Sequence, residues 1–330
     1  MRGPRARSTR ADRGGEAREP RDASALTLHS IPVLRNPILL MAFEGWNDAG
    51  EAASTAAQVV RSQLDGDRFA TIDPEEFFVF TERRPHVRLT RRGRRRIEWP
   101  SNEFFACLHP SDDPEVHDLI VLLGTEPDLR WRAFGDLVMD VARRTGVGLV
   151  VAVGAYFEDI PHTVPPRVNS YAVNGQLHPL LKDQEFGTAK YEGPTGIITV
   201  LTNRFAEAGF PVVNFWGRAP HYITANPNPV VAARILREVA RVLHLSIDMD
   251  LLDEAATRFS EQVQDAVSKD PEAMAYVQEL ERQYEETDED DEEDEAAPST
   301  KGGELPSGAA VVEALEAFLR QRRHPPSPGS

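Results

Sequence analysis

The stretch Ile38–Phe43 reads ILLMAF, and the residues EGWND follow it at positions 44–48. Six consecutive apolar residues are typical of a strand that is buried on both faces, as in a parallel sheet. The glycine and the polar residues after it predict a loop, and the alanine-rich positions 49–64 predict a helix with a surface of small side chains. Asp48 and Glu51 have the spacing of a capping box at the start of this helix.

The alternation of short apolar strands and helices continues along the chain. Further strands are predicted at Phe77–Phe80, Phe104–Leu108, Leu119–Leu123, Leu149–Ala155 and Val212–Trp216. Further helices are predicted at Leu129–Thr145, Ile197–Ala208 and Pro229–Leu243, the last with Asn228 as its cap. Val87–Leu89 and Arg95–Trp99 predict a β-hairpin that makes the sheet mixed. The expected fold class is therefore α/β, with a mostly parallel, mixed sheet between two helix layers and additional C-terminal helices.

The composition divides the chain into five parts. Residues 1–25 are predicted to form a disordered Arg-rich arm, and residues 26–245 an α/β domain. A helical extension at 246–284 and an acidic linker at 285–306 follow. Residues 307–323 predict an amphipathic tail helix that would dock on the body or on a partner. Its apolar stripe consists of Val311, Val312, Leu315, Phe318 and Leu319.

The net charge of −16 is unevenly distributed, and ten acids occupy the eleven positions 285–295. An acidic body repels phosphate backbones, so we expect no nucleic acid as the main partner. The longest apolar runs have strand length, so we expect no membrane span. A single cysteine, Cys107, excludes an intrachain disulfide and a cysteine-based zinc cluster and fits a reducing cytoplasm.

Eight arginines and no acid lie in the stretch Arg83–Arg96, around the predicted hairpin. Such a stretch could attract an acidic surface or the acidic tail of the chain itself. The alternative is a solvated hairpin whose charges protect a sheet edge from unwanted pairing, and we favour this alternative.

Polar residues follow the first predicted strand at the position where open α/β sheets bind ligands. Glu44 is a candidate acid or base, and Trp46 is a candidate stacking platform. The alternative is structural: Asp48 caps the helix, Gly45 makes the turn and Trp46 packs. We favour the structural interpretation.

Thr125 and Glu126 follow the strand at 119–123, where a hydroxyl beside a glycine can face a ligand. The alternative is an ordinary turn in which Asp128 caps the next helix. Here too the structural interpretation is favoured.

Four more candidates lie further along the chain. His162 belongs to a proline-stiffened loop, and Glu192 precedes a predicted helix start whose free amides could hold an anion. His221 and Tyr222 follow the last predicted strand. The alternatives are an oligomer contact for the loop and a structural or interface role for His221.

Several motifs that would point to a defined chemistry do not occur. The histidines form no H-x-x-x-H or H-x-H pair, and the chain has no G-x-G-x-x-G, no G-x-x-x-x-G-K-[ST] and no G-x-S-x-G. We therefore assign no metal ligand, no cofactor and no catalytic residue from the sequence.

Six short blocks carry a resemblance to a known family. They are FEGWNDAG at 43–50, GTEP at 124–127, VGA at 153–155, PHT at 161–163, YEGPTGI at 191–197 and APHY at 219–222. In this order they resemble the bacterial branch of the proteasome assembly chaperone 2 family over about residues 28–285, and LPSG at 305–308 resembles its actinobacterial members. The resemblance implies a three-layer fold similar to nucleoside phosphorylases, self-association and a proteasome-related protein partner. It supplies no catalytic residues.

Two functions compete on these grounds. The first is a chaperone-like, protein-binding role in the cytoplasm, exerted by a homo-oligomer (a trimer is one candidate) without catalysis. The second is a hydrolase- or phosphorylase-like enzyme or small-molecule binder. It would use a pocket where Glu44, Thr125, His162, Glu192 and His221 converge. A concave pocket with two of these groups within hydrogen-bond reach would favour the second function, and scattered side chains the first.

Overall fold

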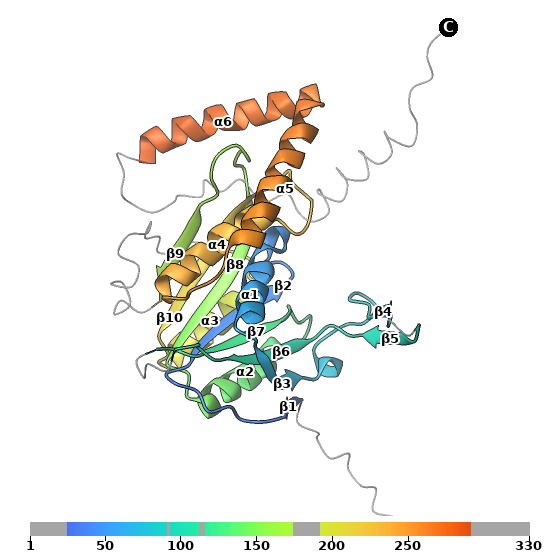
Figure 1. Cartoon of the computed structure of the whole chain (residues 1–330), viewed down its shortest axis with the longest axis vertical. Helices are drawn as coiled ribbons and strands as arrows, with labels where there is room; N and C mark the ends of the chain where they lie inside the picture. The colour runs from blue at the N-terminus through green and yellow to red at the C-terminus, as the bar shows by residue number, and fades with distance from the viewer. Residues whose placement is uncertain (1–24, 91–92, 112–115, 174–191, 292–330) are drawn as a thin grey trace, which may run out of the picture.

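The computed structural model describes residues 25–90, 93–111, 116–173 and 192–291, with side chains in the last range up to residue 286 (Figure 1). The predicted arm before residue 25 and the predicted tail helix at 307–323 lie outside the described residues. The same holds for Val311, Val312, Leu315, Phe318 and Leu319. Their assignment therefore stays a prediction.

An eight-stranded sheet forms the centre of the molecule, in the order β1-β3-β6-β7-β2-β8-β10-β9. Its four middle strands, β7, β2, β8 and β10, run parallel, and the outer strands pair antiparallel. The strands are β1 (Leu26–Leu28), β2 (Ile38–Glu44), β3 (Asp67–Ile72), β6 (Asn102–Cys107), β7 (Leu119–Thr125), β8 (Leu149–Glu158), β9 (Val168–Ala172) and β10 (Val212–Pro220).

Two helix layers cover the sheet, which confirms the α/β prediction. Alternate side chains of β2 enter two separate cores: Ile38, Leu40 and Ala42 face one, and Leu39, Met41 and Phe43 face the other. The first core is closed by α1 (Ala52–Gln63) and α4 (Pro229–Val242), and the second by α2 (Trp131–Thr145) and α3 (Ile197–Glu207).

Local sequence explains how several helices begin and pack. Ala52, Ala53, Ala56 and Ala57 are buried in α1, so its backbone can approach the sheet closely. The Asn228 side chain accepts hydrogen bonds from the backbone N–H groups of Val230 and Val231, both at 3.2 Å, and caps α4 as predicted. Asp128, however, does not cap α2. Its carboxylate accepts from the N–H of Val79 at 2.8 Å, and α2 starts after Arg130 in a left-handed conformation.

One predicted strand does not form, and the predicted hairpin forms outside the main sheet. Phe77–Phe80 follows a short 3₁₀ helix, η2 (Pro74–Glu76), and the N–H groups of Phe77 and Phe78 turn back to the carbonyl of Pro74. Their rings are buried without strand pairing. The hairpin forms, as β4 (His86–Leu89) and β5 (Arg95–Glu98), but as a separate two-stranded sheet. The main sheet is mixed because its outer strands are antiparallel.

The strands β1, β3 and β9 were missed. The sequence of β3, DRFATI, has an irregular register between Arg68 and Ala70, which hides its alternation. The sequence of β9, VNSYA, is polar and lies within a segment that we expected to be irregular. Pairing with β10 makes it a strand.

The C-terminal extension consists of α5 (Asp250–Ser268) and α6 (Pro271–Asp291), which continue from α4 at one end of the molecule (Figure 1). Helix α6 runs beyond the boundary at residue 284 where we expected the acidic linker to begin. Val277 and Leu280 are buried in it. None of the helices in the described ranges is long and apolar enough to cross a membrane.

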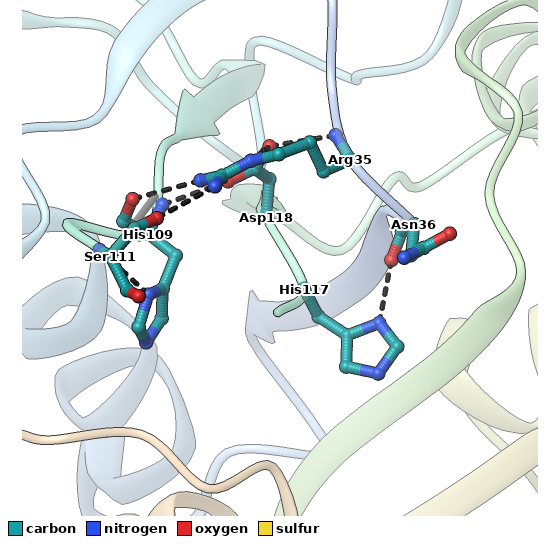
Figure 2. Close-up of polar contacts among 6 residues, drawn as sticks. All are labelled: Arg35, Asn36, His109, Ser111, His117 and Asp118. Atoms are coloured by element: carbon teal, nitrogen blue, oxygen red, sulfur yellow. Dashed lines mark hydrogen bonds and ion pairs between the residues drawn. The ribbon is translucent and has the colours of Figure 1, made fainter. Parts of the chain in front are cut away.

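A buried ion pair joins the amino ends of β2 and β7 (Figure 2). Asp118 is only 1% exposed, and its carboxylate accepts from the backbone N–H of Arg35 at 2.7 Å and from that of His109 at 2.9 Å. The Arg35 guanidinium binds the same carboxylate at 2.8 Å and the carbonyl oxygen of Ser111 at 2.6 Å. Burial alone would raise the pKa of Asp118, but these hydrogen bonds outweigh it and hold the pKa below its usual value.

We expect Asp118→Asn to lower the free energy of unfolding by about 3 kcal/mol at pH 7, because it leaves the Arg35 charge without its partner. The folded-state pKa of Asp118 is lowered, so its contribution is present above pH ~4 and is lost as the pH falls through the folded value. Urea denaturation of both proteins between pH 2.5 and pH 7 measures this. A difference that does not shrink at low pH would contradict the assignment.

Candidate functional site

The carboxyl ends of β2 and β7 bring two of the predicted residues together. In the parallel register Glu44 lies beside Thr125, and the Thr125 hydroxyl donates to the Glu44 carboxylate at 3.5 Å, the outer limit of a hydrogen bond. The pKa of Glu44 is raised, first because protein atoms displace water from it and second because Glu51 carries a like charge nearby. The hydrogen bond from Thr125 and the charge of Arg83 act in the opposite direction.

Glu126 serves the backbone of two loops. It is 8% exposed, and one carboxylate oxygen accepts from the N–H of Ile197, at 2.8 Å, while the other accepts from the N–H of Trp46, at 3.2 Å. The amide at the start of α3 that we expected to be free for an anion therefore already binds a carboxylate of the chain. Gly196 permits this approach, since a Cβ there would lie 2.8 Å from Glu126 Oε1.

Asp48 is 5% exposed and acts as a cap, as the structural interpretation predicted. Its Oδ1 accepts from the N–H of Ala53 at 2.7 Å and from that of Ser54 at 3.2 Å, which are the first free amides of α1. The capping box does not form, because Glu51 turns into the left-handed region at φ 49°. Burial raises the pKa of Asp48 to about 6, although these hydrogen bonds oppose the shift.

A second group of predicted residues lies where β8 and β10 end. The Tyr222 hydroxyl accepts from the backbone N–H of His162 at 2.7 Å and lies 2.7 Å from Nδ1 of the same residue. The direction of this second contact is set by the tautomer of the imidazole. Nε2 of the same ring lies 3.2 Å from Oε1 of Gln264 in α5.

His221 makes the corresponding contact with α6. Its Nε2 lies 3.2 Å from the Tyr276 hydroxyl, and its Nδ1 lies 3.0 Å from the carboxylate of Asp159. Thr163 donates to Glu281 of the same helix at 2.5 Å. The predicted histidines thus join the C-terminal helices to the α/β domain.

Sequence analysis missed the partners in this second group: Gln264, Tyr276 and Glu281. They come from helices about a hundred positions away from His162 in the chain, and nothing in the sequence marks them apart from their place on amphipathic helices. No hydrogen bond or ion pair among the described residues joins the side chains of this group to those around Glu44. Four of the five residues expected to converge therefore form two groups, Glu44 with Thr125 and His162 with His221, and the fifth, Glu192, is exposed.

The surface near these groups offers an aromatic contact but no metal cluster. Trp46 is 57% exposed, so it does not pack as the structural interpretation assumed.

Within the described ranges, no three His, Cys, Asp or Glu side chains are arranged to hold a metal ion. An open groove of about 620 Å³ lies between α4 and α5, lined by residues that include Pro165, Val230 and Ala256, and contains none of the predicted site residues.

Comparison with known proteins shows which family shares this architecture. The sequence profile of the PAC2 family matches residues 42–267, which include all ten strands except β1 and part of β2. This chain belongs to the PAC2 family. No curated protein matches it.

Solved PAC2 relatives cover most of the chain. A PAC2 family protein from Streptomyces avermitilis is 35% identical, with a TM-score of 0.66, over 73% of this chain and 99% of its own. A Mycobacterium tuberculosis proteasome-assembly chaperone homologue is 33% identical, with a TM-score of 0.63, over 73% and 99%. A second M. tuberculosis protein, of unknown function, is 28% identical, with a TM-score of 0.73, over 83% and 93%.

For Asp48→Asn we expect a stability that depends on pH differently from that of the wild type. The folded-state pKa of Asp48 is raised to about 6, so the wild type loses stability as the pH rises from about 4 through 6, by up to about 3 kcal/mol. Asn stays neutral and keeps the Oδ1 acceptor, so the variant should exceed the wild type at pH 8 and match it near pH 4. Thermal unfolding across this range measures the difference, and Asp48→Ala, which lacks the acceptor, is the control. A gap between Asn variant and wild type that is independent of pH would refute the shift.

Tyr222→Phe should loosen the C-terminal helices. The substitution removes the hydroxyl that contacts both the backbone N–H and Nδ1 of His162. We expect this loss to lower the free energy of unfolding of this region by about 1–2 kcal/mol. Amide hydrogen exchange should accelerate in α5 and α6 while β2 stays protected. Tyr276→Phe, which loses one longer and more exposed contact, should have a smaller effect. Equal exchange of α5 in Tyr222→Phe and wild type would contradict the proposed attachment.

Proposed function

We propose that this PAC2 protein is a chaperone-like, protein-binding protein of the cytoplasm whose partner is proteasome-related, and that it does not act as an enzyme. Membership of the family supports the protein-binding role. The partner class is suggested by the 33% identical relative, which is a proteasome-assembly chaperone homologue.

The observation that carries this proposal is the use of polar groups at the carboxyl ends of the strands. Glu126 and Asp48 accept hydrogen bonds from backbone amides, and the His162 ring is held between Tyr222 and Gln264. A general acid or base must instead reach a substrate proton. Side chains committed to the backbone are suited to shaping a rigid surface.

Trp46 is the best candidate for a partner contact on this surface. Its backbone N–H is fixed by Glu126, and its ring is exposed on a rigid loop. Exposed tryptophans on fixed backbone are typical of residues that dominate binding energy in protein interfaces. We propose that the tail stripe at 311–319 is a second, tethered contact.

The enzyme hypothesis has one observation in its favour. Glu44 and Thr125 are within hydrogen-bond reach and the pKa of Glu44 is raised, as expected of a general acid or base in a ligand site. However, neither Glu44 nor Thr125 lines the groove between α4 and α5, and none of the residues that line it was predicted as a site residue. We therefore place the protein-binding function first.

Affinity purification from the native host tests the proposal. The wild-type bait should retain a proteasome-related protein, and deletion of residues 308–321 or Trp46→Ala should reduce its recovery at least about tenfold. Leu108→Ala, which truncates another exposed apolar residue, is the matched control and should leave recovery unchanged. An identical partner list for all baits would contradict the proposal. So would turnover of a nucleoside or ester by the purified chain that is abolished in Glu44→Gln.

A further inference from the structure

The hairpin β4–β5 has no layer to cover it. All eight of its strand residues are exposed, and it projects from the body on the side away from α6 (Figure 1). It is fixed at its base, where the Phe80 and Trp99 rings meet edge to face at 4.7 Å. An isolated two-stranded hairpin is marginally stable in water, so a projecting one gains stability when something packs on it.

One face of the hairpin is cationic. Arg88 lies directly opposite Arg96, and like charges in this position destabilise a strand pair. Arg88 Nε donates a hydrogen bond to the Glu98 carboxylate at 3.2 Å. The stretch Arg83–Arg96 nevertheless contains eight arginines and no acidic residue. An anionic partner would relieve this repulsion.

The opposite face is mainly apolar. Val87 lies opposite Ile97, and Leu89, two positions along the same face, lies opposite Arg95. The three apolar side chains are exposed. A partner that fits the hairpin must therefore supply a dense negative charge and apolar side chains together.

The C-terminal segment of the chain carries this combination. Ten acids occupy positions 285–295, and the apolar residues Val311, Val312, Leu315, Phe318 and Leu319 follow within the same segment. We propose that the hairpin of one copy binds segment 285–319 of a second copy, with its arginines on the acids and its apolar face on the apolar residues. The proposal concerns the purified chain alone and does not depend on the proposed proteasome-related partner.

Position favours a second copy over the same chain. Helix α6 carries the first acids and ends across the body from the hairpin (Figure 1). The four acids beyond Asp291 extend at most about 14 Å from it, whereas a domain of about 220 residues has a radius of gyration of about 17 Å. The end of α6, which carries the first acids, therefore lies on the far side of its own molecule from the hairpin, where a second copy can approach it.

An acidic protein segment also fits better than nucleic acid. The net charge of −16 would oppose the approach of a long polyanion, whereas a short acidic segment contacts the hairpin alone. A hairpin that binds the tail of the next copy makes a head-to-tail contact, which closes into a ring when the rotation allows it.

Two variants of the full chain separate the two halves of the contact. In the first, Arg88, Arg95 and Arg96 are replaced by Glu; in the second, residues 285–330 are deleted. By sedimentation equilibrium, each variant should self-associate at least about tenfold more weakly than the wild type. Mixed together they should associate again, because the first keeps its tail and the second keeps its hairpin. The matched charge control is a variant in which three arginines of α2 are replaced by Glu: Arg132, Arg143 and Arg144.

The wild-type association should also weaken between 0.05 and 0.5 M salt, since the Debye length falls over this range. A monomeric wild type at micromolar concentration, unchanged association in either variant, or a mixture that fails to associate would each overturn the proposal. Retention of a single-stranded RNA by the wild type in place of self-association would overturn it in favour of nucleic acid.

Discussion

The structure depends on the burial of β2 on both faces. The side chains of Ile38–Phe43 alternate between two cores, and the strand backbone pairs with β7 on one side and β8 on the other. A strand in this position can only be apolar, which is why ILLMAF is continuous. The constraint also fixes where chemistry is possible: polar side chains return only at the strand ends, beside Arg35 at one end and Glu44 at the other.

Buried carboxylates hold these two ends in place. Asp118 joins the loops at the amino ends, and Glu126 and Asp48 do the same at the carboxyl ends. Each accepts hydrogen bonds from two backbone amides. The outcome differs with the partner. The pKa of Asp118 falls because hydrogen bonds, first those from Arg35, outweigh burial, whereas the pKa of Asp48 rises because burial outweighs its hydrogen bonds.

Two motifs that carry the family resemblance have structural roles. The motif around Asn47 that supports the resemblance builds the turn in which Asp48 and Glu126 act, and the motif at 219–222 builds the attachment of α5 and α6. Trp46, within the first of these motifs, is exposed, as are the strand residues of the arginine-rich hairpin.

The sequence by itself determined the parts of the molecule that depend on neighbours along the chain. The apolar run of β2, the Asn228 cap and the turn residues of the hairpin specify their structure within a few residues, so the α/β class and most elements could be predicted. The strands β3 and β9 were decided by their neighbours in the sheet, because their own sequences lack a clear alternation. Tertiary structure alone also decided that His162 meets Gln264 and that the amide of Ile197 meets Glu126, across separations of 102 and 71 residues. A side chain shows by its type that it can bind, but the partner it meets is set by how distant elements pack.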